Sequence, residues 1–190
     1  MATVVADEDV LADLASLPGN LILFGGPQTN AVARVLASAQ PFSEVSLDTV
    51  QQGKEPRPER ETPLEGKTPR LEGGFAIGDC SFTAEGTGLV SLGPRSLGVH
   101  GGGGLVASVA GTTLSGFGKA VELLHSDLFR TNSWQHRLPD YMVAGPDFVR
   151  SRGGQKPAQH RPSSSLHGVV GAGFWGYSWE YRADSAYLSC

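Results

Sequence analysis

The chain has 190 residues, 39% of them hydrophobic, and a formal net charge of −4. This length suits one domain that can bury a substantial core. A negative chain whose arginines lie mostly in loop-like stretches offers no basic surface to a phosphate backbone, so we expect no nucleic acid partner. No apolar window approaches the roughly 18 residues of a membrane span, and the first residues lack the pattern of a signal peptide. As it stands, the chain is predicted to be soluble and cytoplasmic, without a membrane partner.

The amino-terminal part predicts a helix, a strand, a second helix and a short strand. Asp7 can cap the first helix, which Pro18-Gly19 ends. After an apolar strand at residues 21–24, the second helix is expected to begin in the turn Gly25-Gly26-Pro27. Residues 42–50 fit a strand at the sheet edge. The second helix should bury the apolar positions Ala31, Val32, Val35 and Leu36.

Two polar segments, residues 51–70 and 151–165, predict disordered insertions because they cannot bury enough apolar surface to offset their ordering entropy. Between them we expect a hairpin at 74–83 that turns at Gly78-Asp79, and then a strand at 88–92. Later elements follow in order: a strand at 105–110, an amphipathic helix to Phe129, a strand at 140–144 and a last strand at 167–175.

Three of the apolar strands end in a glycine-containing polar turn, at residues 25–30, 111–113 and 145–147. An amphipathic stretch follows the first two turns, as in the βα units of a parallel sheet. We therefore predict a single α/β domain over residues 1–190. Its expected fold is a three-layer open mixed sheet, mostly parallel with an antiparallel hairpin addition, with helices on both faces.

Two cysteines, Cys80 and Cys190, are too few for a disulfide framework. Cys80 is expected as a half-buried strand residue beside Asp79, whose charge does not favour a reactive thiolate. Cys190 is the last residue of the chain, where chain ends fray. Neither cysteine is assigned a function.

No catalytic motif is complete. Residues 171–176 match the glycine spacing of a dinucleotide fingerprint, but too few residues follow for a crossover unit, which favours a terminal strand. His100 and the four glycines after it resemble an oxyanion-hole motif, yet no Gly-x-Ser-x-Gly sequence accompanies them. The five histidines have no metal-site spacing. We predict no catalytic residue, metal ligand or cofactor, although a triad assembled from distant residues stays open because triads are defined by geometry.

The strand-end turns are the candidate ligand site, and phosphate is the ligand that they would suit, since helix N-termini offer free backbone amides and a positive dipole end. The P-loop lysine pattern is absent. The candidate residues are Gly25, Gly26, Gln28, Asn30, Gly111, Thr112 and Thr113.

Aromatic residues gather toward the carboxyl end of the chain. They predict either an apolar cap over the sheet or a docking face for another domain, because aromatics concentrate in interface cores. The candidate interface residues are Trp134, Phe174, Trp175 and Trp179.

Six short segments follow one another in a familiar order over nearly the whole chain. They are Gly19–Leu21 with Gly25–Pro27 and Asn30; Gly74–Gly78; Gly86–Leu89; Ala110–Thr112 with Gly116; Pro139-Asp140 with Gly145-Pro146; and Ala172–Trp175. In this order they resemble the C-terminal region of large, secreted, prolyl-oligopeptidase-like α/β-hydrolases of fungi and bacteria. The resemblance implies that the catalytic serine, acid and histidine belong to an upstream domain. The two insertions and the glycine run depart from the family pattern.

These observations lead to two alternative hypotheses for the function. The first is a non-catalytic accessory domain that packs against or orients a catalytic α/β-hydrolase domain or a homologous partner. The second is a small independent hydrolase or ligand-binding module with its crevice between the turns Gly25–Asn30 and Gly111–Thr113. An accessory domain should expose an apolar face around its tryptophans, whereas a binding module should have a concave pocket at the strand ends.

Overall fold

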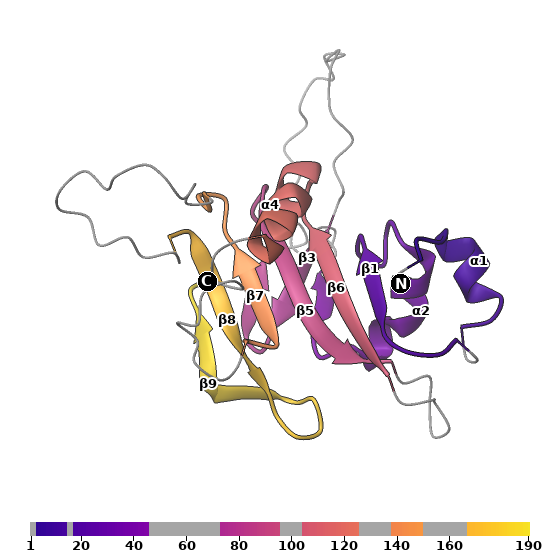
Figure 1. The fold of residues 1–190 in the computed structure, drawn as a ribbon. Coiled ribbons are helices and arrows are strands. Elements are labelled where there is room, and N and C mark those ends of the chain that lie inside the picture. The colour runs from indigo at the N-terminus through magenta and orange to yellow at the C-terminus, as the bar shows by residue number, and fades with distance from the viewer. Residues whose placement is uncertain (1–2, 15–16, 46–72, 96–103, 126–137, 150–166) are drawn as a thin grey trace, which may run out of the picture.

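The computed structural model describes residues 3–14, 17–45, 73–95, 104–125, 138–149 and 167–190 (Figure 1). Its largest element is a six-stranded sheet in the order β1-β6-β5-β7-β8-β9. Only β1 and β6 run parallel, and every other pair of neighbours in this sheet is antiparallel. The strands are β1 (Leu21–Phe24), β5 (Gly88–Pro94), β6 (Leu105–Gly111), β7 (Tyr141–Ala144), β8 (Val169–Trp175) and β9 (Tyr181–Leu188).

A second, three-stranded antiparallel sheet has the order β2-β3-β4. Its strands are β2 (Ser43–Val45), β3 (Gly74–Ile77) and β4 (Cys80–Phe82), and the turn Gly78-Asp79 joins the last two as predicted. In Figure 1 this small sheet lies behind the large sheet, and helix α4 (Leu114–Leu124) crosses in front of the large sheet. The remaining described helices are α1 (Asp7–Leu11), α2 (Ala31–Leu36) and the short 3₁₀ helix η1 (Ala37–Ala39).

The predicted three-layer α/β fold, with a mostly parallel sheet and helices on both faces, is therefore wrong. The described residues form mostly strands, and a single strand pair is parallel. The strand expected at the sheet edge and the hairpin expected as an addition to the main sheet instead form the separate small sheet. Apolar periodicity identifies a strand but carries no information about which strand it pairs with or in which direction.

The main core lies between the two sheets. Alternate residues of β5 point to opposite sides, so that Leu89 packs toward the small sheet while Val90 packs on the α4 side. Strand β7 has all four residues buried, because a layer covers each of its sides. This core contains the buried side chains of Phe75, Ile77, Cys80, Phe82, Leu89, Tyr141, Val143 and Trp175.

Two smaller cores hold the helices. One joins α4 to the side of the large sheet that faces away from the small sheet, through Leu123, Met142, Ala144, Phe148 and Val169. The other packs α1 and α2 against β1 and β6 through Leu14, Leu23, Val32, Ala33, Leu36 and Val106.

Helix α2 begins later than expected. Asn30 is its N-cap, with a side-chain oxygen that accepts from the Ala33 amide at 2.9 Å. The helix also buries Ala33, whereas Val35, which was expected to pack inward, is 48% exposed. Asp7 does not cap its own helix: its carboxylate accepts a hydrogen bond from the Ala31 amide at 2.6 Å, linking α1 to the start of α2.

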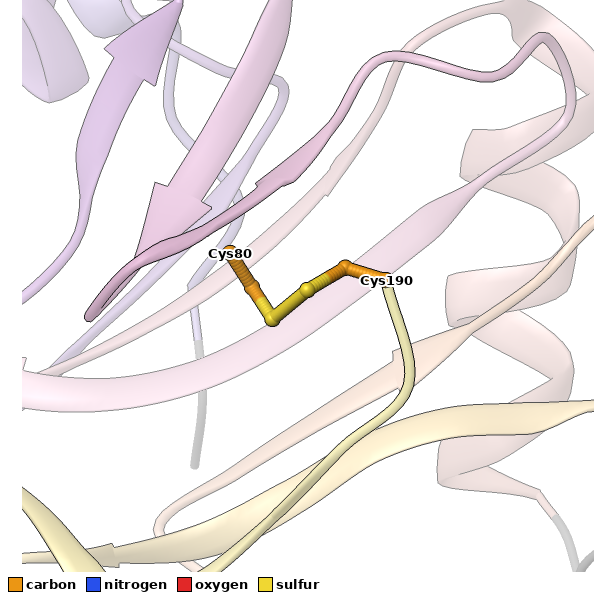
Figure 2. The surroundings of a disulfide bond; sticks show 2 residues. All are labelled: Cys80 and Cys190. Atoms are coloured by element: carbon orange, nitrogen blue, oxygen red, sulfur yellow. A yellow bond between two sulfur atoms is a disulfide. The ribbon is translucent and has the colours of Figure 1, made fainter.

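Cys80 and Cys190 form a disulfide, which was not expected from the sequence, since two cysteines were judged too few for a disulfide framework (Figure 2). Their Cα atoms are 5.7 Å apart, within the normal range for a disulfide. The bond ties the start of β4 to the end of the chain just after β9. It therefore links the small sheet to the last strand of the large sheet, and structural disulfides of this kind persist in oxidising compartments.

Removing the disulfide should destabilise the fold strongly. The bond closes a loop between residues 110 apart in sequence, and restricting so long a loop in the unfolded chain contributes about 4–5 kcal/mol. We expect reduction, or the double variant C80S/C190S, to lower the free energy of unfolding by up to about this amount in a urea titration. Equal midpoints for the oxidised and reduced chains would contradict the assignment.

We expect the folded protein to lose stability at alkaline pH because of Tyr141. Its side chain is 1% exposed, and burial, followed by the charge of Tyr181, raises its pKa to about 12 from 10.0. A raised folded-state pKa means that the stabilisation is complete below pH 10 and is lost as the pH rises from 10 through 12.

The variant Tyr141→Phe isolates this effect. The Tyr141 hydroxyl has no hydrogen-bond partner among the described residues, so its removal should cost little at neutral pH. We expect urea titrations at pH 7 to give similar stabilities for the two proteins, and titrations above pH 10 to favour the variant by about 1–3 kcal/mol. A parallel alkaline loss in both proteins would assign the effect to other groups.

Candidate functional site

The parallel pairing of β1 with β6 brings the first two glycine turns to the same edge of the large sheet. Leu21 lies beside Val106 and Phe24 beside Val109, so β1 ends beside Val109 and β6 continues along the same edge to Gly111. The helices that follow diverge: α2 packs on Leu23, whereas α4 packs on Met142, on the other side of the sheet. Such a divergence between neighbouring parallel strands is the place where open sheets form ligand crevices.

Two adjoining cavities lie at this point, with volumes of about 40 and 60 Å³. The smaller one is enclosed by the first turn, the start of β3 and the end of β6. The larger one reaches inward between α2 and β6. They share the lining residues Gly26, Pro27, Phe42 and Ala110.

The structure brings most of the predicted ligand residues together. Gly26, Gln28, Gly111 and Thr112 line the smaller cavity, and Gly25 lines the larger one together with Gly26. Asn30 and Thr113 are absent from both linings. Each of these two residues caps a helix.

The polar side chains of these turns are mostly used within the fold. The Asn30 amide donates to the Phe24 carbonyl at 3.3 Å, in addition to capping α2. The Thr113 hydroxyl accepts from the amides of Gly116 at 3.2 Å and Gly86 at 3.1 Å. The Thr112 hydroxyl donates to the Ala84 carbonyl at 2.8 Å and accepts from the Thr87 amide at 3.2 Å. These threonines therefore hold the second turn against the chain just before β5.

Two glycines of the turns are also explained by the fold. Gly25 has a φ of +99°, which side-chain-bearing residues rarely adopt. A Cβ on Gly111 would lie 2.1 Å from the Phe117 amide nitrogen, so glycine is required for the close approach of α4. Neither glycine needs a ligand to account for it.

Gln28 and Thr29 are the polar residues of the first turn that line the smaller cavity. The first of them, Gln28, lies over the small sheet. Its amide group covers Gly73, where a Cβ would lie 2.4 Å from Nε2. Ser108, 5% exposed, supplies a hydroxyl to the wall of the larger cavity. The described lining of the two cavities contains no charged side chain. The site can thus hold an uncharged group and hydrogen-bond to it.

The sequence did not identify many of the lining residues, among them Gln40, Phe42, Gly73, Phe75, Leu89, Ser108 and Ala110. Phe42, Gly73 and Phe75 reach the site because the small sheet packs beside the first turn. No local pattern marks that packing. Ser108 and Ala110 could have been found, because they alternate on one side of a predicted strand that ends at the candidate turn.

The candidate interface residues form no exposed group among the described residues. Trp175 is 7% exposed, its ring lies 4.3 Å from that of Tyr141, and its Nε1 donates to the Leu92 carbonyl at 2.8 Å. Trp179 is partly buried against the main core, and Phe174 is of intermediate exposure. Trp134 lies outside the described residues, as do the two predicted insertions, the glycine run from His100 to Gly103, and Phe129.

No protein-family model, curated protein or solved structure matches the chain. The resemblance to prolyl-oligopeptidase-like hydrolases therefore stays a prediction. Among the described residues, no three His, Cys, Asp or Glu side chains are grouped as a metal site would require. Within the same ranges, no helix is long and apolar enough to cross a membrane.

Thr112→Val tests the structural role of this predicted ligand residue. Valine keeps the shape but leaves the buried hydrogen-bonding groups of Ala84 and Thr87 with one partner fewer, which should cost about 1–3 kcal/mol of unfolding free energy. Thr29→Val is the control, because the Thr29 hydroxyl makes an exposed hydrogen bond to Gly26. Urea titration should separate the two variants. Similar losses in both would show that the Thr112 hydrogen bonds are not important for stability.

Proposed function

We propose that this chain is a binding module for a small, uncharged, largely apolar ligand, held in the crevice at the carboxyl ends of β1 and β6. One observation carries the proposal: residues from both strand-end turns, Gly26 and Gln28 with Gly111 and Thr112, line one cavity. A concave site at this position is what the binding-module hypothesis requires.

The chemistry of the walls restricts the ligand. Apolar surface comes from Leu23, Leu36, Phe42 and Ala110, while Ser108 supplies a hydroxyl. A charged ligand would lose its hydration without gaining an ion pair from the described lining, at a cost of several kcal/mol or more. The walls therefore favour a neutral group.

The size of the crevice restricts it further. The cavities of about 40 and 60 Å³ are far smaller than the roughly 300–1,000 Å³ of pockets that hold drug-sized molecules or cofactors. The ligand is therefore a compact alcohol, phenol or amide, or the end of a longer apolar chain.

The accessory-domain hypothesis has less support among the described residues. It requires an exposed apolar face around the tryptophans, and Trp175 is buried while Trp179 packs on the core. Docking to a catalytic hydrolase domain stays a prediction from the sequence resemblance.

The test is a titration of ¹⁵N-labelled chain with 1-butanol and with phenol, followed by amide chemical shifts. We expect saturable shifts at Gly26, Gln28 and Ser108, with no comparable effect of butyrate, whose carboxylate should not enter. Ala110→Leu fills the space shared by both cavities and should abolish the saturable shifts.

Ala107→Leu is the matched control, because Ala107 lies on the same strand but is absent from the lining of either cavity. It should bind as the unchanged protein does. Shifts that never saturate, or that persist in Ala110→Leu, would contradict the proposed site.

A further inference from the structure

Strand β1 forms one edge of the large sheet and exposes two large apolar side chains. Ile22 is 62% exposed and Phe24 is 56% exposed. Because side chains two residues apart in a strand point to the same side, the two lie together on one face. The whole strand, Leu-Ile-Leu-Phe, carries no charge.

The opposite edge of the same sheet is different. Strand β9 carries Arg182 and Asp184, whose side chains form an exposed ion pair. Charged side chains on an edge strand discourage pairing with another chain. Of the two edges, β1 is therefore the one suited to accept a further strand.

The backbone of β1 also has groups directed away from β6. In a parallel pair, alternate residues bond to the neighbour, and the Gly25 amide donates to the Val109 carbonyl at 2.8 Å. Leu21 and Leu23, like Gly25, direct their backbone groups toward β6. The amides and carbonyls of Ile22 and Phe24 therefore point to the outer edge. The Phe24 carbonyl accepts from Asn30 at 3.3 Å and has a second lone pair available.

We propose that β1 pairs antiparallel with β1 of a second copy of this chain, forming a dimer with a continuous sheet. In the register centred on Leu23, the Leu23 residues of the two copies lie opposite each other. Ile22 of each copy then lies opposite Phe24 of the other, so that the twofold axis produces two such pairs. Each such pair can exchange two backbone hydrogen bonds, because both residues direct these groups outward. The same register places the exposed side chains of Ile22 and Phe24 side by side across the interface.

A second copy fits this edge because a twofold interface joins identical patches, which must be complementary to themselves. An uncharged apolar strand meets this condition, since pairing it with itself brings no like charges together. A register centred on Ile22 or on Phe24 would leave one of the two apolar side chains opposite Asn20 or Gly26. The Leu23-centred register is thus the one that buries both.

Sedimentation equilibrium of the oxidised full chain tests the dimer. We expect a reversible monomer–dimer equilibrium, and Ile22→Lys should raise its dissociation constant at least about 30-fold, because each dimer loses two apolar contacts. Tyr187→Lys is the control, since Tyr187 is also exposed, at 58%, but lies on the opposite edge strand β9. It should dimerise as the unchanged chain does.

Amide exchange tests the register. Exchange at Ile22 and Phe24 should slow as the protein concentration rises, whereas exchange on β9 should not change. If Ile22→Lys fails to fold, Ile22→Thr keeps the strand propensity while removing most of the apolar contact. A monomer at all concentrations, open-ended association, or a dimer that survives these substitutions would overturn the proposal.

Discussion

The parallel pairing of β1 with β6 is the contact on which the rest of the arrangement depends. It is the one parallel pair in the large sheet, and it places the two glycine turns at the same edge. Because α2 and α4 then pack on opposite sides of this pair, a crevice remains between the turns. The same pairing leaves β1 as an edge strand with apolar side chains exposed.

The small sheet completes both the core and the crevice. Phe75 packs into the main core with its neighbours on β3 and β4, while the same segment forms one wall of the smaller cavity. The Cys80–Cys190 disulfide connects this sheet to the end of the chain after β9. Stability of the small sheet and the shape of the candidate site are thus linked, because a shift of β3 would change both.

Sequence reasoning found the local elements and missed their long-range relations. The strands predicted at 21–24 and 140–144, the hairpin turn at Gly78-Asp79 and the helix after Thr113 follow from apolar spacing and turn chemistry. The structure has them, the second strand running from Tyr141 to Ala144. Strand β9 was missed because none of its residues is fully buried, half are exposed, and charged residues interrupt its pattern. The sheet order and the disulfide depend on contacts between residues far apart in sequence. For the candidate site, Gly26 and Gln28 could be predicted, whereas Phe42 and Gly73 could not.

A crystal structure of the chain under xenon pressure would reveal both the β1–β6 pairing and the crevice, because xenon enters dry apolar cavities and the same data show the surrounding fold. We expect β1 to run parallel to β6 and a xenon atom to lie between Leu23, Leu36 and Ala110, which line the larger cavity. A different pairing of β1, or xenon bound elsewhere with this cavity filled by side chains, would contradict this expectation.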